Sequence, residues 1–190
     1  MTEGGLNGIN VLLGVSGGIA AYKAADLASK LTKARASVTT VMTENACRLV
    51  RPKTFEAVTA NPVFTSMWTG PEEYRIGHID LADRSDLVII APATANIIAK
   101  AAHGISDDLL STTICVCWEK PTLLAPAMNT RMWENPITQQ NVQTLKDKLN
   151  FRLVGPATGS LACKTEGVGR MSEPADILHA ACELAKTIRS

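Results

Sequence analysis

Asn129 is the residue whose type and position point most directly to chemistry. It follows a short apolar run, Thr122 to Ala125, that ends at Pro126 and predicts a buried strand. Ligands of open α/β sheets bind outside the carboxyl ends of the strands. An asparagine amide offers donors and an acceptor without charge, so Asn129 could hold a carboxylate and an amide together. Asparagine is also a favoured helix cap, and position alone leaves both roles open.

Small polar residues follow two further predicted strands. Gly14 to Gly18 includes Ser16 and separates a β-branched run from a helical pattern, so its glycines could admit a phosphate at a helix N-terminus. The glycine spacing differs from the dinucleotide fingerprint, and Thr43 stands where a ribose-binding acid would be expected. This favours a mononucleotide over NAD. Thr43 is also the expected N-cap of a short helix. The glycine spacing alone, however, favours a tight turn without a ligand.

The segment from Pro92 to Asn96 repeats this design after another apolar run. Thr94 and Asn96 could contact a flat, phosphate-bearing ligand, although each could simply cap the following helix. The coincidence of three small-polar strand ends, counting Asn129, is the stronger argument for a shared site.

The elements that must position these residues alternate between strands and helices. Alternation of this kind indicates a parallel sheet covered by helices on both faces, in a Rossmann-like three-layer α/β sandwich. The apolar runs predict strands at Asn10 to Val15, Ser37 to Met42, Asp86 to Ala91, Pro121 to Ala125 and Phe151 to Val154. Helical patterns include one with Ile19, Tyr22, Ala25, Leu27, Ala28 and Leu31 on or near one face, and one with a buried stripe of Ile137, Val142, Leu145 and Leu149.

The boundaries follow from the same pattern. We expect a flexible tail over residues 1–8, a single domain over residues 9–190, a loop from Gly155 to Gly169 and a closing helix from Pro174 to Ile188. The N-terminus has no basic start or apolar segment typical of a signal peptide. The apolar runs are too short for a membrane span.

Composition narrows the class of protein. The 190 residues are 46% hydrophobic and 19% charged with a net charge of +1, which gives no electrostatic footprint for nucleic acid or an anionic membrane. Five scattered cysteines argue against a disulfide framework and a zinc site, so we expect no metal and a reducing, cytoplasmic location.

Two motifs resemble the homo-oligomeric flavin-containing cysteine decarboxylases. Pro126 to Trp133 is similar to the family's Pro-x-Met-Asn-x-x-Met-Trp signature at every fixed position, and the stretch from Leu161 through Met171 resembles its substrate-recognition clamp. Pro92 to Ile97 is similar to another family segment, although Thr94 and Ile97 replace its Ser and Thr. Lys164 departs from the usual glycine, which puts a cation beside Cys163.

The resemblance implies an FMN cofactor at a subunit interface of a trimer, or of a dodecamer built from trimers. It implies decarboxylation of 4′-phosphopantothenoylcysteine to 4′-phosphopantetheine in coenzyme A biosynthesis, by a carboxy-lyase. The catalytic residues would be His78, Asn129 and Cys163, with Ser160, Leu161 and Ala162 over the substrate. The flavin contacts would be Ser16, Gly17, Gly18, Ile19, Thr43, Glu44, Asn45, Thr94, Ala95, Asn96, Ile97 and Ala127.

Each assigned role has a chemical reason. An imidazole titrates near neutrality, so His78 is a plausible base, although without the resemblance a surface or capping histidine is the favoured interpretation. Cys163 lies in a glycine-bordered stretch and would donate the final proton. Neutral Asn129 would orient the carboxylate without stabilising the charge that must leave.

Two alternatives remain beside this hypothesis. A peptidyl-cysteine decarboxylase would stop at an enethiol, but Cys163 argues against that class. A non-catalytic FMN-binding regulatory subunit usually carries long acidic extensions. Many bacterial relatives carry a ligase domain, and we expect any ligase activity here to come from a separate partner polypeptide.

Overall fold

Six parallel strands form one sheet in the order β3-β2-β1-β4-β5-β6 in the computed structural model, which describes residues 5–68, 77–160 and 166–188. The sheet consists of β1 (Asn10–Val15), β2 (Ser37–Met42), β3 (Val63–Phe64), β4 (Leu87–Ala93), β5 (Thr122–Pro126) and β6 (Arg152–Leu153). The strand order reverses between β1 and β4, which pair in parallel with Val11 opposite Leu87. This reversal creates the crevice in which doubly wound sheets bind ligands.

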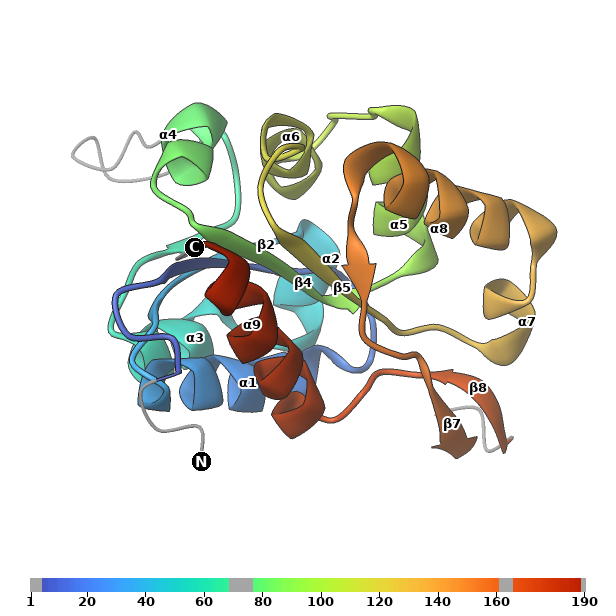
Figure 1. Cartoon of the computed structure of the whole chain (residues 1–190), viewed down its shortest axis with the longest axis horizontal. Coiled ribbons are helices and arrows are strands. Elements are labelled where there is room, and N and C mark those ends of the chain that lie inside the picture. The colour runs from blue at the N-terminus through green and yellow to red at the C-terminus, as the bar shows by residue number, and fades with distance from the viewer. Residues whose placement is uncertain (1–4, 69–76, 161–165, 189–190) are drawn as a thin grey trace.

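Helices cover both faces of the sheet, as Figure 1 shows. One face carries α1 (Ala21–Lys33), α3 (Pro52–Thr59) and α9 (Pro174–Ile188). The other carries α4 (His78–Asp83), α5 (Ala95–His103), α6 (Leu109–Val116) and α8 (Pro136–Leu149). Two short helices, α2 (Glu44–Leu49) and α7 (Thr130–Trp133), directly follow the carboxyl ends of strands. The predicted three-layer α/β sandwich is therefore confirmed.

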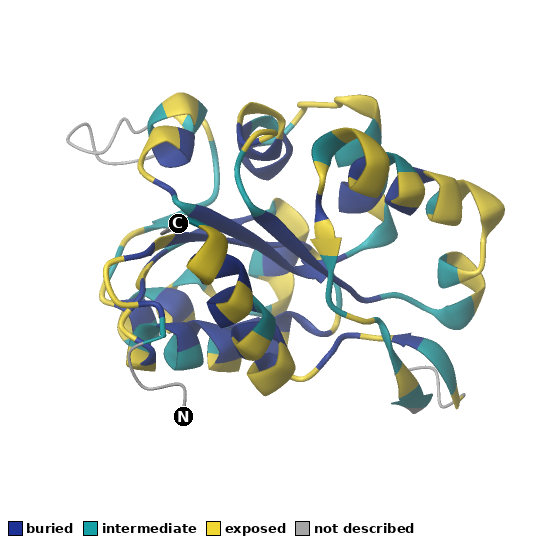
Figure 2. Ribbon diagram, in the orientation of Figure 1, coloured by how far each residue is buried: buried dark blue, intermediate teal, exposed yellow. Residues whose placement is uncertain are grey.

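The strands of the sheet are more completely buried than the helices that cover them (Figure 2). Every residue of β4 is buried, as expected for a central strand covered on both faces. One apolar cluster packs the sheet against α1 and α9, and a second packs its opposite face against α5, α6 and α8. Among the described residues, no helix is long and apolar enough to cross a membrane.

Several sequence-based boundaries were wrong. Gly155 to Gly169 was expected to be a loop, but it contains an antiparallel pair, β7 (Ala157–Ser160) and β8 (Glu166–Arg170). These strands are rich in glycine and small polar residues, so their β-propensity is weak. Leu6 is fully buried and its N–H donates to the carbonyl oxygen of Ala34 at 3.2 Å. The packed part of the chain therefore begins before residue 9, where the domain boundary was predicted.

Two expected apolar stripes were also partly wrong. Ile19 and Tyr22 are 66% and 62% exposed, because the buried side of α1 is formed by Ala21, Ala24 and Leu27 with their helical neighbours. Ile137 is 61% exposed in the first turn of α8, whereas Val142 and Leu145 are buried. Helix α4, which begins at His78, was not predicted at all.

Candidate active site

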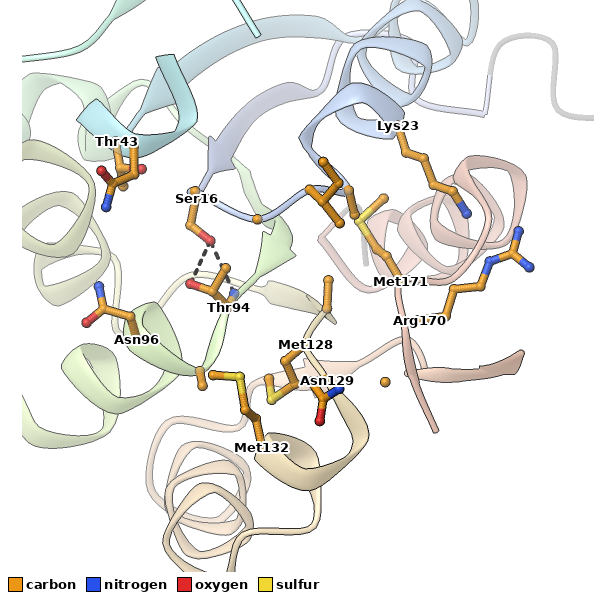
Figure 3. A pocket seen from close by; sticks show the side chains of 18 of the residues that line it. Ser16, Lys23, Thr43, Thr94, Asn96, Met128, Asn129, Met132, Arg170 and Met171 are labelled. Carbon is orange, nitrogen blue, oxygen red and sulfur yellow. Dashed lines mark hydrogen bonds between the residues drawn. The ribbon is translucent and has the colours of Figure 1, made fainter. Parts of the chain in front are cut away.

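A cavity of about 930 Å³ opens at the carboxyl edge of the sheet, beside the strand reversal. Its volume suits a cofactor-sized ligand, because small-molecule sites usually measure ~300–1,000 Å³. The wall combines the loop after β1, the starts of α2 and α5, and the segment after β5 (Figure 3). Eleven of the predicted flavin contacts line it, namely Ser16, Gly17, Gly18, Ile19, Thr43, Glu44, Asn45, Thr94, Ala95, Asn96 and Ala127.

Ser16 joins the two sides of the crevice. Its hydroxyl oxygen lies 2.7 Å from the carbonyl oxygen of Pro92 and 3.0 Å from the Thr94 hydroxyl, and the contact with Thr94 is drawn in Figure 3. It also accepts a hydrogen bond of 3.1 Å from the Thr94 N–H. Ser16 is only 2% exposed, so it holds the ends of β1 and β4 together at the floor of the cavity.

The glycines after Ser16 are required by close packing. A Cβ atom on Gly17 would lie 2.4 Å from the Asn45 Cβ and 3.0 Å from the Asn45 carbonyl carbon. A Cβ atom on Gly18 would lie 3.1 Å from the Thr94 methyl group. The loop therefore passes directly against the starts of α2 and α5, and its backbone forms part of the cavity wall.

Thr43 and Thr94, the threonines at the strand ends, both cap helices, which was one of the two roles predicted for them. The Thr43 hydroxyl accepts a hydrogen bond from the Ala46 N–H of α2, and the Thr94 hydroxyl accepts one from the Ile97 N–H of α5. These caps turn the N-termini of α2 and α5 toward the cavity. Ile97 differs from its neighbours, because its side chain is buried in the core and lines no part of the cavity.

Asn129 lies in the cavity wall and also caps α7. Its Oδ1 accepts a hydrogen bond of 2.9 Å from the Arg131 N–H. The preceding Met128 N–H donates to the Gly169 carbonyl oxygen at 2.9 Å, which ties this segment to β8. Capping and cavity lining therefore coexist in Asn129, so the cap fixes the orientation of an amide that faces the cavity.

The pair of strands β7 and β8 packs closely against the segment around Asn129. A Cβ atom on Gly169 would lie 2.2 Å from the Met128 carbonyl oxygen, and one on Gly167 would lie 2.2 Å from the Thr130 hydroxyl. Ser160 is the last residue of β7. The predicted residues Leu161, Ala162 and Cys163 lie outside the described part of the chain.

His78 does not line the cavity with the other predicted residues. It is the first residue of α4, is only partly exposed, and belongs to the helix layer beside α6. Its predicted catalytic role therefore needs either a different arrangement of α4 or a second copy of the chain.

Several cavity residues were not predicted as site residues, among them Lys23, Lys100, Arg170 and Met171. Lys23 could have been noticed, because it lies one helical turn before the buried Leu27. Lys100 forms ion pairs of 2.6 Å with Asp107 and 2.7 Å with Asp108. Burial opposes the charge of Lys100, but the hydrogen bonds to the two aspartates outweigh it and raise the Lys100 pKa.

A second charged group consists of Glu173 and the cavity residues Lys23 and Arg170. Glu173 Oε1 accepts hydrogen bonds from Lys23 Nζ at 2.8 Å and from an Arg170 guanidinium nitrogen at 2.6 Å. The hydrogen bond from Lys23 is the main cause of a lowered Glu173 pKa. The second group was not visible as a cluster in the sequence, because Lys23 and Glu173 lie 150 positions apart.

Comparison with known proteins decides the family. The Flavoprotein family matches residues 2–186. The chain belongs to the Flavoprotein family. This Flavoprotein chain is 47% identical over 173 residues to the coenzyme A biosynthesis bifunctional protein CoaBC of Bacillus subtilis, covering 91% of the chain but 42% of that protein. It thus spans less than half the length of that relative.

Shorter relatives and solved structures match across nearly their whole length. A probable phosphopantothenoylcysteine decarboxylase of Streptococcus mutans is 42% identical over 164 residues, which cover 86% of this Flavoprotein chain and 91% of that protein. A PPC decarboxylase mutant complexed with pantothenoylaminoethenethiol has a TM-score of 0.81 at 31% identity, with 94% and 98% of the two chains covered. The FMN-dependent cysteine decarboxylase SpaF has a TM-score of 0.77 at 34% identity, with 95% and 99% covered.

Proposed function

We propose that this Flavoprotein chain binds FMN and decarboxylates 4′-phosphopantothenoylcysteine to 4′-phosphopantetheine, a step of coenzyme A biosynthesis. The support is the identity to CoaBC and to the probable decarboxylase of S. mutans, together with a cavity at the carboxyl edge of the sheet. The observation that carries the proposal is Asn129, an oriented neutral amide in the wall of a cofactor-sized cavity.

The residues present fit a flavin mononucleotide. A phosphate accepts hydrogen bonds from backbone N–H groups at helix N-termini, and two such termini, of α2 and α5, border the cavity. Gly17 packs so tightly against Asn45 that only a residue without a side chain leaves this wall intact. We assign Ser16 to Ile19, Thr43 to Asn45, Thr94 to Asn96 and Ala127 to the cofactor, whereas the predicted contact Ile97 does not line the cavity.

Asn129 would orient the cysteine end of the substrate. Its Oδ1 accepts the Arg131 N–H, which fixes the plane of the amide, and we assign the amide N–H group as the donor to the substrate carboxylate. A cation at this position would stabilise the carboxylate most strongly in the ground state, where its full charge is still present. A neutral donor avoids that penalty while it fixes the carboxylate in place.

Bound FMN would supply reversible two-electron redox chemistry for the cysteine side chain. His78 would remove a proton from the cysteine moiety, and Cys163 would donate the proton that completes 4′-phosphopantetheine. Ser160, Leu161 and Ala162 would cover the substrate and exclude water.

We further propose that His78 acts in the cavity of a second copy of the chain. His78 lies on α4, away from the cavity of its own chain, so a single chain would not bring it to Asn129. A closed homo-oligomer would supply His78 from a neighbouring subunit, and the trimer or dodecamer implied by the family resemblance would satisfy this need.

A peptidyl-cysteine decarboxylase is the second candidate, because the structurally similar SpaF is an FMN-dependent cysteine decarboxylase and the substrate of this chain could be another cysteine compound. The two activities predict different final products. The peptidyl enzyme would leave an oxidised enethiol on a peptide, whereas the proposed enzyme would return both electrons and release a saturated thiol.

Flavin binding and product analysis test the proposal. We expect the purified protein to take up FMN, with the absorbance of a bound flavin, and to release CO2 from 4′-phosphopantothenoylcysteine with formation of 4′-phosphopantetheine. Measurement of both quantities on one preparation, by absorbance and mass spectrometry, is sufficient. A protein that takes up no FMN, or one that acts only on a cysteine-terminated peptide, would contradict the proposal.

A further inference from the structure

Lys23 and Arg170 form a pair of cations at one end of the cavity. Both donate to the same oxygen, Glu173 Oε1, at 2.8 and 2.6 Å, so the amine and the guanidinium lie within a few ångströms of each other. They come from different elements, α1 and the end of β8, and Glu173 directly precedes α9. Three segments distant in sequence therefore converge on this point.

The group has an unbalanced charge. Two cations share one carboxylate, and among the described residues Glu173 is the only hydrogen-bond partner of either cation. Lys23 is only 8% exposed, and a buried ammonium is costly unless its charge is compensated. A second anion would complete this compensation, and an amine beside a guanidinium is well suited to a phosphate group.

The position of the pair separates it from the predicted flavin contacts. In Figure 3, Lys23 and Arg170 lie at the side of the cavity opposite Thr43 and Asn96. The Met128 N–H bonds to the Gly169 carbonyl oxygen, so Arg170 follows directly after the strand residue that anchors the Asn129 segment. An elongated substrate held at Asn129 by its cysteine end would thus have cations available for a distant anionic group.

We propose that Lys23 and Arg170 bind the phosphate ester of the acyl-cysteine substrate and set the preference of this site for phosphorylated over unphosphorylated substrates. This inference rests on the proposed function for the identity of the substrate. The same chemistry could instead serve the phosphate of FMN. We assign the substrate because two helix N-termini and the glycine loop already suit the flavin phosphate at the other side of the cavity.

Equilibrium binding separates phosphate recognition from catalysis. Calorimetry of the FMN-loaded protein would compare 4′-phosphopantetheine with pantetheine, which differ only in the phosphate ester and have no carboxylate left to lose. We expect the wild-type protein to prefer the phosphorylated compound and Arg170→Met to lose about tenfold or more of that preference, with unchanged affinity for the unphosphorylated compound. Arg170→Lys should retain part of the preference. Arg152→Met, which removes an exposed arginine outside the cavity, should retain all of it.

Lys23→Met should have the same effect, with Lys186→Met as the control for loss of an ion-paired lysine. If Lys23→Met does not fold, the half-exposed Arg170 still decides the question. A wild-type protein without preference for the phosphorylated compound, or an Arg170→Met variant with its preference intact, would overturn the inference.

Two further measurements separate binding of the substrate phosphate from binding of the flavin phosphate and from catalysis. Titration of the apoprotein with FMN and riboflavin should give the same affinity ratio in wild type and Arg170→Met; a lower ratio in the variant would assign the cations to the flavin and overturn the inference.

CO2 release is measured separately. Phosphate preference without decarboxylation would refute the proposed function alone, whereas decarboxylation without phosphate preference would refute this inference alone.

Discussion

At the scale of single residues, the cavity combines structural and chemical duties in the same side chains. Asn129 caps α7 through Oδ1 while it lines the cavity, and Thr94 caps α5 while it contacts Ser16. A substitution that preserves the cap but alters the charge can separate these duties. Aspartate is such a replacement for asparagine, because both residues are good N-caps.

Asn129→Asp should therefore fold normally and lose turnover. The new carboxylate would accept the Arg131 N–H as the amide does, but it would repel the substrate carboxylate in a desolvated site. We expect a fall in kcat/KM of about a hundredfold or more, measured by CO2 release, which corresponds to ~2.7 kcal/mol of lost transition-state stabilisation. Asn135→Asp is the matched control, because Asn135 caps α8 in the same way and lines no part of the cavity. Unimpaired activity of Asn129→Asp would reduce Asn129 to a cap.

At the scale of elements, the cavity depends on how closely loops and strands approach each other. The loop after β1 touches the start of α2 at Gly17, and β8 touches the Asn129 segment at Gly167 and Gly169. These contacts leave no room for a Cβ atom. A single methyl group therefore tests whether this packing shapes the flavin site.

Gly17→Ala should weaken FMN binding. The added methyl group would lie 2.4 Å from the Asn45 Cβ, so the loop or α2 must move. Overpacking of this kind costs ~1–3 kcal/mol, and we expect the FMN dissociation constant to rise by about tenfold, as measured by flavin fluorescence titration. Gly77→Ala is the control, because its methyl group would enter open space. Unchanged FMN affinity in Gly17→Ala would show that the loop does not shape the cofactor site.

At the scale of the whole molecule, an ion pair connects two helices that cover the same face of the sheet. Glu173 links α1 to the beginning of α9 through Lys23, and its pKa is lowered mainly by that hydrogen bond. A lowered carboxyl pKa means that the folded state binds protons less readily than the unfolded state. The contribution of this ion pair to the stability of the folded state is therefore complete above the ordinary glutamate pKa. It disappears as the pH falls through the lower pKa that Glu173 has in the folded state.

Glu173→Gln should consequently lower the melting temperature most at neutral pH. The loss, which we expect to be a few degrees, leaves the buried Lys23 without its carboxylate and should diminish as the pH falls through the carboxyl range. Thermal melts of both proteins across this range measure the effect. Glu183→Gln is the control, because Glu183 pairs with the largely exposed Lys186 and should have a smaller effect. A difference between wild type and Glu173→Gln that does not change with pH would contradict a stabilising role of the ion pair.

The assembly has its own test, which rests on the position of His78 outside the cavity of its own chain. His78→Asn and Asn129→Asp proteins should each be inactive but should regain activity after their subunits are mixed by dissociation and reassociation. With equal amounts, about a quarter of the sites would combine both native residues if each site is shared by two subunits. Decarboxylation assays before and after mixing measure the recovery. No recovery, despite mixed oligomers seen by native mass spectrometry, would place His78 and Asn129 in the same subunit.

Sequence-based predictions were accurate where they depended on residues close in sequence and failed where they depended on distant ones. The strands at residues 10–15 and 37–42 and the caps at Thr43 and Thr94 depend on neighbours within a few positions, and they were confirmed. Exposure of Ile19 and Tyr22 was mispredicted, because it depends on which side of α1 meets the sheet and which side meets the cavity. The strands β7 and β8 were missed, because their local β-propensity is weak and they are stabilised by pairing with each other.

The sequence by itself determined the alternation of buried strands and helices, the small polar residues at the strand ends, and the motif around Asn129. These features are local, since apolar periodicity and capping preferences depend on adjacent residues. Only the tertiary structure decided that Lys23, Arg170 and Glu173 meet at one end of the cavity and that His78 lies outside it. These outcomes depend on how the layers pack, because packing brings together side chains that the linear chain separates by up to 150 positions.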